Sequence, residues 1–452
     1  MSMMVLSDVV SLQDRGKYQG LLGANVGFGS VIGPFMAAGF IESATWRAHF
    51  WTVSPLAAVC GVVIIFLLPK GKVSAGAKEK LKLIDYWGVF FSTAATMLLL
   101  IPLSGGGSYF AWGSSMVISM MVLGGICLVI FMIIEWKFAT LPMMPLHLFR
   151  NRAVASMLVA NILFGAVYFS EVYFIPLYCQ LVRGNTAIES AALTIPLSVG
   201  LSSASIVSGY IISHRGQYID VLWFGFSLWT IALGLQILFD PKTNAAVIVV
   251  VLLIQGWGVG CIFQPTLVAL QAHCSKADRA VVIAVRNYLR QFGGAAGLAM
   301  FSAIFANVLQ NKLESSKDLP TSLAKSIGSN VFRTPDLSLL SPAEKKAVIN
   351  AYAQGMRICF IIFVPILGIC LLSCLFIKDT GLQRAEEKVE AASDTVPVAP
   401  LPQDIEKGTR SSPEKDENID NGEKPKVSEM HKLGSNRISS EETLASRPQP
   451  SI

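Results

Sequence analysis

Ten long apolar runs constrain this chain more than any other feature of its sequence. Each run is long enough, at about 1.5 Å of rise per helical residue, to cross a hydrocarbon core roughly 30 Å thick. The runs are residues 20–41, 50–69, 86–104, 115–135, 154–180, 190–212, 219–239, 246–270, 285–308 and 356–377. Because a segment in lipid must satisfy its own backbone hydrogen bonds, we predict an all-α polytopic membrane protein.

Composition supports this class and excludes several others. Of the 452 residues, 53% are hydrophobic and 15% are charged, which is more apolar surface than a water-soluble domain can cover. The eight cysteines and five histidines show no metal-ligand spacing, and no glycine loop for ATP is present. No nucleophile and base pair suggests itself. We therefore expect no enzyme activity, cofactor, metal, ATP or nucleic-acid partner.

Positive charge predicts the topology. Five lysines lie between the second and third runs, so this loop should be cytoplasmic. Alternation along the ten runs then places both chain ends on the cytoplasmic side. The exception is the basic loop 309–354, which falls on the outer side, where long loops obey the charge rule less strictly. Within it, Ser341 and Glu344 flank Pro342 in a capping-box pattern that predicts a helix start.

Residues 14–40 combine charge, glycine and proline in one segment, DRGKYQGLLGANVGFGSVIGPFMAAGF. A charged, turn-prone loop leads into an apolar helix whose small residues leave a bare strip for a second helix. Pro34 frees a backbone carbonyl and permits a bend. We predict that Gly29, Gly33 and Pro34 form a bending, close-packed interface.

These motifs have counterparts in a known family. DRGKYQG followed by GSVIGP resembles the loop and antiporter-type helix of the major facilitator superfamily, in the fungal style of its fourteen-helix drug:proton antiporter branch. Further segments resemble the same branch in the same order, over about residues 7–377. They are WRAHFWTVSPL, IDYWG, EWKFATLPMMPLHLFRNR, PLYCQLVRGNTAIESA, SGYIISHRGQY, FQPTLVALQA and DRAVVIAVRNYLRQFGGAAG. One departure is Ala37 and Ala38, where the family usually has glycines.

The resemblance implies a major facilitator fold with about ten of its fourteen helices. Four more helices would precede Gly20, so we interpret the chain as truncated at its N-terminus, either in the gene model or in the product. The expected parts are a helix remnant and cytoplasmic loop (1–19), the end of the N-terminal bundle (20–69), a linker with two extra central helices (70–152), a C-terminal six-helix bundle (153–377) and a disordered cytoplasmic tail (378–452).

The resemblance also implies a function. Members of this branch export small amphipathic compounds, such as drugs, toxins or secondary metabolites, by proton-coupled alternating access. A siderophore carrier or another specific-solute proton carrier is the first alternative, and a non-transporting fragment is the second. The implied partners are a small-molecule substrate, protons and the lipid bilayer. We expect the plasma membrane, with the vacuolar membrane as the alternative.

Glu171 is the candidate proton site. An ionisable group inside a span costs on the order of 2.5–3.5 kcal/mol on insertion, so it is a functional hypothesis by default. Desolvation disfavours the charged form of a carboxyl, which makes proton exchange plausible. Glu171 lies toward the outer end of its run, however, where water can reach it. A wet or hydrogen-bonded glutamate is therefore the alternative.

Other polar groups in the runs are candidates for substrate contact. Gln180, Gln255 and Gln264 can orient a ligand, or they can equally join helices. Gln255 and Gln264 flank the stretch QGWGVGCIFQP, so we predict a cavity there with Trp257 as its stacking surface. Arg290 matches an FRQ-like segment of the family and suggests a gating or interface charge, with headgroup snorkelling as the alternative.

Four charges near the N-terminus complete the candidates. Asp8, Asp14, Arg15 and Lys17 would latch or orient the cytoplasmic loop that the resemblance implies. Solvated loop charges are an equal alternative, because exposed ion pairs contribute only about 0–1 kcal/mol.

Overall fold

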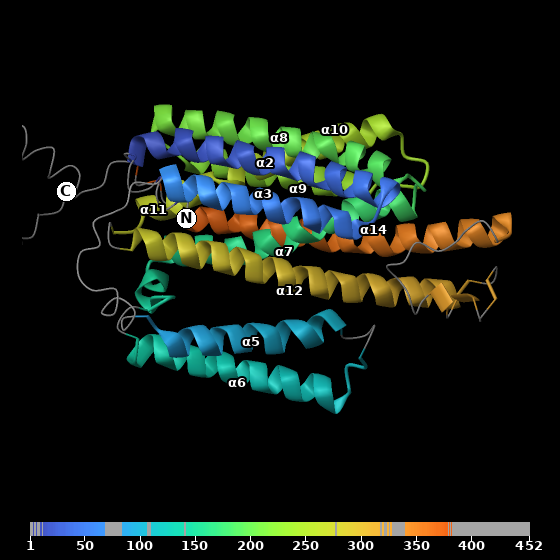
Figure 1. The fold of residues 1–452 in the computed structure, drawn as a ribbon, viewed down its shortest axis with the longest axis horizontal. Coiled ribbons are helices and arrows are strands. Elements are labelled where there is room, and N and C mark those ends of the chain that lie inside the picture. The colour runs from blue at the N-terminus through green and yellow to red at the C-terminus, as the bar shows by residue number, and fades with distance from the viewer. Residues whose placement is uncertain are drawn as a thin grey trace, which may run out of the picture. The chain divides into compact units, whose positions relative to one another are not determined.

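The described part of the chain consists mainly of long helices (Figure 1). The computed structural model describes residues 3, 6, 10, 12–67, 84–105, 110–139, 142–275, 278–316, 319–320, 323–324, 326–327, 340–377, 379 and 381. Its helices are α2 (Leu12–Ser43), α3 (Trp46–Leu67), α5 (Tyr86–Gly105), α6 (Ser115–Lys137), α7 (Arg152–Leu181), α8 (Ala187–Arg215), α9 (Ile219–Gln236), α10 (Ala245–Phe263), α11 (Pro265–Ala272), α12 (Arg279–Glu314) and α14 (Pro342–Ser373). With α10 and α11 taken together, the described residues form ten helical spans long and apolar enough to cross a membrane, which confirms the predicted class.

Local sequence explains where several helices begin and end. The predicted capping box starts α14, since the Ser341 backbone N–H donates to Glu344 at 2.8 Å and the Glu344 N–H donates to the Ser341 hydroxyl at 3.4 Å. Helix α12 extends beyond the predicted run 285–308 at both ends. The segment between α12 and α14 is therefore shorter than the predicted loop 309–354.

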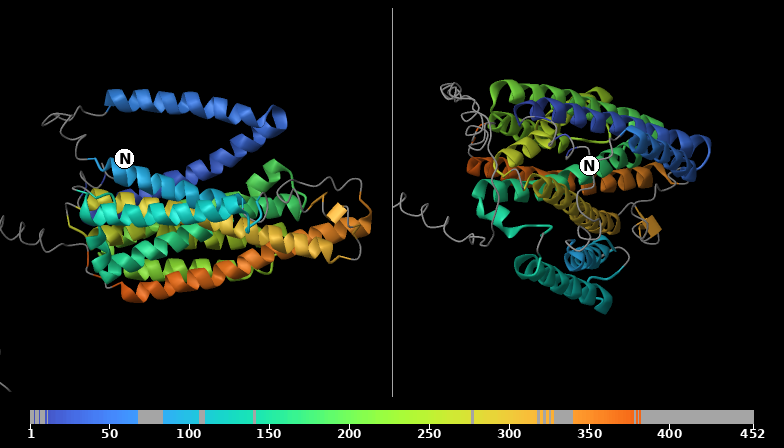
Figure 2. Two further views of the ribbon diagram at one scale, coloured as in Figure 1. Left: turned by 90° about the horizontal axis from the view of Figure 1, so that it is seen from below. Right: turned by 60° about the vertical axis from the view of Figure 1, so that its left-hand side comes forward.

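Helices α7 to α14 pack on one another and contain most of the buried apolar residues. Helix α7 packs mainly on α12, α8 on α10, and α14 on α7, α9 and α12. By contrast, α3 buries none of its residues; it meets α2 at the turn between them and diverges from it along its length (Figure 2). An apolar helix with no buried residue presents a surface that suits lipid rather than water.

The two central helices form a hairpin that is attached at two points. Helices α5 and α6 pack on each other, and α5 also packs on α12 (Figure 1). The hydroxyls of Thr96 on α5 and Tyr288 on α12 lie 3.0 Å apart. Near the end of α6, the buried Glu135 carboxylate accepts hydrogen bonds from the backbone N–H groups of Met143 and Met144 at 3.1 and 3.2 Å. These bonds fix the hairpin to the segment that leads into α7.

Helices α2 and α8 lie in backbone contact. The close-packed face of α2 consists of Gly16, Gly20, Gly23 and Gly27. A Cβ atom added at Gly16 would lie 2.8 Å from the carbonyl oxygen of Gly209, and one at Gly20 would overlap the carbonyl oxygen of Ser205. Side chains cannot enter at these places, so glycine is what permits the close approach.

The predicted interface of α2 lies on a different face of this helix. A Cβ atom at Gly29 or Gly33 would meet nothing within 4 Å in the described part of the chain, so no described residue packs there and the close-packed interface stays a prediction. At about 100° per residue, Gly29 points roughly 200° away from Gly27 and so misses α8. Pro34 lies on an exposed part of α2, which continues to Ser43; a bend there remains a prediction.

The predicted loop before this helix is also wrong. Helix α2 begins at Leu12, so Asp14, Arg15 and Lys17 are helical. Arg15 is 2% exposed and donates from Nε to the carbonyl oxygen of Val10 at 3.1 Å, so it is not a solvated loop charge. Asp14 and Lys17 are exposed, and Asp8 lies outside the described residues. The glycines that suggested a loop are instead the residues that face α8.

The glycine contact predicts unequal effects of the same substitution on one helix. Gly20→Ala should lower the melting temperature of the purified protein, because the methyl group forces α2 from α8 and such overpacking costs about 1–3 kcal/mol. Gly29→Ala is the matched control. It should leave the melting temperature unchanged or raise it, since alanine favours a helix over glycine by about 1 kcal/mol. Equal shifts in both variants would contradict the contact.

Candidate functional site

A buried carboxyl group lies at the centre of the packed helices. Glu171 of α7 is 0% exposed, and its Oε2 accepts two hydrogen bonds. The Trp229 indole of α9 donates at 2.9 Å and the Gln255 amide of α10 donates at 2.6 Å. The side-chain amide of Gln236, at the end of α9, donates to the side-chain oxygen Oε1 of Gln255 at 2.6 Å. We call these four residues the Glu171 cluster.

The charge at Glu171 has no counter-ion among the described residues. Their one salt bridge joins His147 to Asp278, remote in sequence from the cluster. The second carboxyl oxygen, Oε1, has no hydrogen-bond partner in the described part of the chain. An ionised Glu171 would therefore be a buried charge held only by neutral donors, which is an energetically demanding arrangement.

The predicted access of water to Glu171 is wrong. Glu171 lies about 15 Å before the end of α7, and side chains of α9 and α10 enclose it. Of the predicted alternatives, the structure excludes the wet glutamate. The sequence indicates where Glu171 lies along its run, but it does not indicate which helices cover its side chain.

Aromatic rings connect the Glu171 cluster to the end of α10. Phe164 meets the Trp229 ring edge-on at a centroid distance of 5.2 Å and stacks on Tyr168 at 5.7 Å. Both Phe164 and Tyr168 lie 5.9 Å from the ring of Phe263. These four rings form a continuous apolar wall from Glu171 to the point where α10 stops.

The predicted run 246–270 is broken at that point into α10 and α11. Pro265 has no N–H to donate to Cys261, so the ladder of helical hydrogen bonds is interrupted there, while Gln264 itself keeps right-handed helical geometry with φ of −94° and ψ of −40°. The Leu267 N–H consequently donates to Gln264 at 2.9 Å instead of to Phe263. The free carbonyl oxygen of Phe263 accepts a hydrogen bond from Nη2 of Arg286 on α12.

Two arginines of α12 lie buried beside this break. Arg286 and Arg290 are 1% and 6% exposed, and the Arg290 guanidinium lies 4.1 Å from the centroid of the Phe263 ring. Both donate to the side-chain oxygen of Asn287, at 3.2 and 3.4 Å. Headgroup snorkelling is therefore wrong for Arg290. We call these two residues the arginine pair.

The arginine pair retains unused donors. Nε of Arg286, and Nε and Nη1 of Arg290, have no partner in the described part of the chain. No described carboxylate forms a salt bridge with either residue. Buried positive charge with unused donors suits an anion, because charge-assisted hydrogen bonds to guanidinium are strong and directional.

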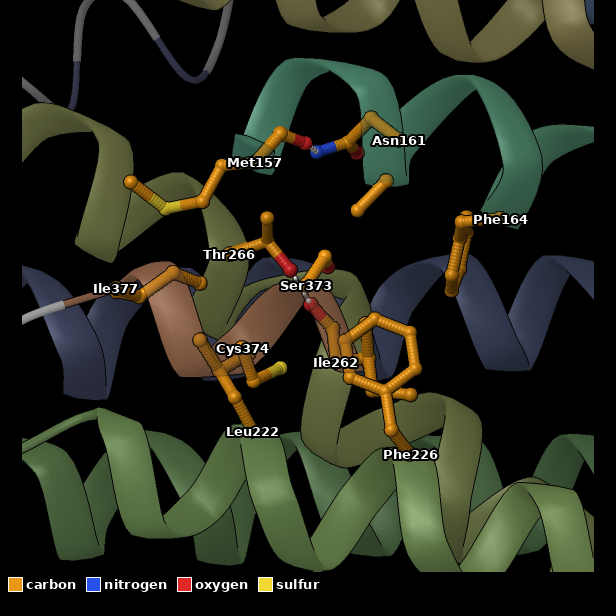
Figure 3. Close-up of a pocket in the computed structure, with 11 residues that line it drawn as sticks. Met157, Asn161, Phe164, Leu222, Phe226, Ile262, Thr266, Ser373, Cys374 and Ile377 are labelled. Atoms are coloured by element: carbon orange, nitrogen blue, oxygen red, sulfur yellow. Dashed lines mark hydrogen bonds between the residues drawn. The ribbon is translucent and has the colours of Figure 1, made fainter. Parts of the chain in front are cut away.

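A small cavity lies between α7, α9, the junction of α10 and α11, and the end of α14 (Figure 3). Its volume is about 10 Å³, room for about one water molecule, and Phe164, Asn161 and Thr266 contribute to its lining. The lining includes the polar side chains of Asn161, Thr266 and Ser373, and each is already bonded within its own helix. Asn161 donates to the carbonyl oxygen of Met157 at 2.8 Å, Thr266 to that of Ile262 at 2.6 Å and Ser373 to that of Cys370 at 2.6 Å. The cavity is too small to hold a substrate as it stands.

The remaining predicted residues do not share one cavity. Trp257 points about 200° from Gln255 on α10 and lines a different cavity with α8 and α9. Gln264 is buried, its Cγ faces Gly23 of α2, and neither amide atom has a partner among the described residues. Gln180 is half-buried on the last turn of α7. The predicted cavity joining Gln255, Trp257 and Gln264 is therefore wrong.

Sequence reasoning missed Trp229, which donates to Glu171. Its indole N–H was the available signal, because such a donor needs an acceptor when it is buried. Nothing in the spacing of one chain pairs it with a residue fifty-eight positions earlier.

Comparison with known proteins places this architecture in a family. Residues 1–298 match the family model described as Major Facilitator Superfamily. The chain belongs to the major facilitator superfamily. This confirms the resemblance drawn from the sequence motifs.

Several relatives are fungal transporters of this superfamily. The chain is 43% identical over 392 residues to citrate exporter 1 of Yarrowia lipolytica, covering 87% of this chain and 58% of that protein. It is 32% identical over 388 residues to the MFS-type transporter clz4 of Cochliobolus lunatus, covering 85% and 67%. It is 29% identical over 389 residues to the efflux pump dotC of Dothistroma septosporum, also covering 85% and 67%. The chain thus spans between 58% and 67% of the length of these relatives.

The Glu171 cluster predicts a stability difference between two tryptophans. Trp229→Phe removes one of the two donors to Glu171, and an unsatisfied buried acceptor costs about 1–3 kcal/mol. The melting temperature should fall. Trp257→Phe is the matched control and should produce a smaller shift, since Trp257 is half-buried and lines a cavity on another face of α10. A larger shift for the control would contradict the assigned role of the cluster.

Proposed function

We propose that this chain is the larger part of a proton-coupled exporter of small organic molecules that works by alternating access. The observation that carries the proposal is the burial of Glu171 of α7 without a counter-ion among the described residues, in hydrogen-bond contact with α9 and α10. An ionisable group held in a span is a functional site by default. The names of the relatives, which include an exporter and an efflux pump, support the direction of transport.

The proposed coupling works through the two carboxyl oxygens of Glu171. Oε2 keeps the Trp229 and Gln255 hydrogen bonds, while Oε1 is open to carry the proton. When the proton leaves, a buried negative charge remains, and α7, α9 and α10 must rearrange to let water or substrate compensate it. The two protonation states thus favour different arrangements of the helices, as an exchanger requires.

The arginine pair supports a small carboxylate anion as the substrate. Its unused donors, Nε of Arg286 together with Nε and Nη1 of Arg290, can each give a charge-assisted hydrogen bond to a carboxylate oxygen. The relative of 43% identity is named for citrate, which is such an anion. Amphipathic metabolites are the second candidate, because the aromatic wall from Trp229 to Phe263 offers stacking surface to an uncharged ligand. A specific-solute carrier for siderophores has no such observation in its favour.

We further propose the plasma membrane as the location, with the vacuolar membrane as the alternative and the C-terminus on the cytoplasmic side. The basic loop between the second and third spans supports this orientation. We also propose that Gly29, Gly33 and Pro34 form a bending, close-packed interface, and the open surface at the two glycines is available for a partner helix.

Removing the titratable group should separate net export from exchange. In vesicles that contain the intact carrier, Glu171→Gln should lower export driven by a pH gradient by at least about tenfold, because it fixes a neutral side chain at an otherwise charged site. Substrate-for-substrate exchange should persist, since it needs no change of protonation. Isotope-labelled citrate is the probe for both fluxes.

Glu189→Gln is the matched control for this experiment. Glu189 caps the start of α8 and is exposed, so its loss should leave the ratio of export to exchange unchanged. Retention of full pH-driven export by Glu171→Gln would contradict the role of Glu171. Loss of both fluxes with normal folding would also contradict it, because that would place Glu171 in substrate binding.

Charge removal at the arginine pair tests the substrate class. Arg290→Gln should raise the Kd for citrate by roughly 10- to 100-fold, the loss expected for a charge-assisted hydrogen bond of about 1.5–3 kcal/mol. Arg357→Gln is the control, since Arg357 is exposed on α14. Unchanged citrate binding in Arg290→Gln, measured by calorimetry on the folded protein, would favour the amphipathic metabolites.

A further inference from the structure

A second and larger cavity lies on the other side of α10 from the Glu171 cluster. Its volume is about 340 Å³, within the range of roughly 300–1,000 Å³ typical of ligand pockets. Three helices line it. The lining includes Val207 and Arg215 of α8, Asp220 and Phe224 of α9, and Trp257 and Cys261 of α10. None of them takes part in the proposed proton or substrate sites.

The lining is polar at one end and apolar at the other. Arg215 is the last residue of α8, Gly216 caps the helix with φ of 71°, and Asp220 lies in the first turn of α9. These residues meet at the end of both spans. Val207 lies on the same side of α8 about 12 Å deeper, and Phe224 follows Asp220 by one turn on α9. The polarity therefore changes along the direction in which a bilayer changes from headgroups to chains.

The length of α8 places the polar end at the membrane surface. Its 29 residues span about 43 Å, more than the roughly 30 Å hydrocarbon core. The terminal Arg215 can thus lie at the level of the lipid headgroups, while Val207 and Phe224 remain beside acyl chains. Val207 and Phe224 are 42% and 53% exposed, so the cavity opens toward the surrounding bilayer.

We propose that this cavity binds one phospholipid that has a zwitterionic headgroup with a primary amine, as in phosphatidylethanolamine. The Arg215 guanidinium binds the phosphate, and the Asp220 carboxylate accepts hydrogen bonds from the ammonium group. Gln217 lies between them in sequence and adds an amide to the same end of the cavity. One acyl chain occupies the apolar end beside Trp257 and Cys261.

Charge complementarity selects this headgroup over others. The described residues hold a single salt bridge, elsewhere in the chain, so Arg215 and Asp220 do not neutralise each other. The cavity lining has one positive and one negative side chain, which match a zwitterion, and the nearby Asp379 carboxylate accepts the backbone N–H of Tyr218 at 3.2 Å. A purely anionic headgroup would be repelled by Asp220, and a choline headgroup has no N–H group to donate to it.

Lipid retention by the full chain tests this assignment. The protein is purified in detergent, incubated with equal amounts of phosphatidylethanolamine, phosphatidylcholine and phosphatidylglycerol, and examined by native mass spectrometry. We expect about one retained phosphatidylethanolamine per protein. Arg215→Gln and Asp220→Asn should each reduce that retention by at least about tenfold, the loss expected for one charge-assisted contact. Arg152→Gln and Asp240→Asn are the matched surface controls and should retain the lipid.

A second pair of variants tests the apolar end without altering charge. Val207→Phe should fill the cavity and expel the acyl chain, whereas Ile206→Phe places the same ring on an exposed neighbour that does not line it. Equal retention in these two variants, with both folded, would overturn the proposal. So would equal retention of all three lipids by the unmodified protein, or stronger binding of phosphatidylglycerol. Because the test measures no transport, it is independent of the proposed export function.

Discussion

The two hydrogen bonds to Oε2 of Glu171 are the interaction on which the arrangement of the packed helices depends. They tie α7 to α9 through Trp229 and to α10 through Gln255. A carboxyl inside a membrane span is tolerated only when its polar atoms are provided for, so these three helices must hold their relative rotation to within the reach of a hydrogen bond. The aromatic contacts around Phe164 then follow, because the same rotation brings the rings of α7, α9 and α10 together.

A different principle joins α2 to α8. There, glycines bring the two backbones into contact. Hydrogen bonds add to this contact, since Ser202 donates to the carbonyl oxygen of Ala24 at 3.2 Å and the Ile188 N–H donates to the Glu42 carboxylate at 3.3 Å. The helices around Glu171 are thus joined through a buried carboxyl, whereas α2 and α8 are joined mainly through backbone contact.

Sequence alone predicted the ten spans and the start of α14, because both are local. Hydropathy over about twenty residues identifies a span, and the capping box at Ser341 is complete within four residues. What sequence could not predict was the direction in which each side chain points. Trp257 was placed in a contact that its helical phase excludes, the contact of the α2 glycines with α8 was not predicted, and Glu171 was expected near water. Those errors concern tertiary neighbours, which depend on residues distant in the chain, such as Trp229 for Glu171.

The bond from Arg286 to the carbonyl oxygen of Phe263 has a consequence for motion. A helix that breaks at proline normally leaves its last carbonyl groups to water or to its own next turn. Here the partner is Arg286 of α12, so a different helix supplies the hydrogen bond at the junction of α10 and α11. This hydrogen bond persists when α12 moves together with α10 and α11. A displacement of α12 alone would break it and leave the Phe263 carbonyl oxygen without its partner, so the position of α12 controls how far α11 can move relative to α10.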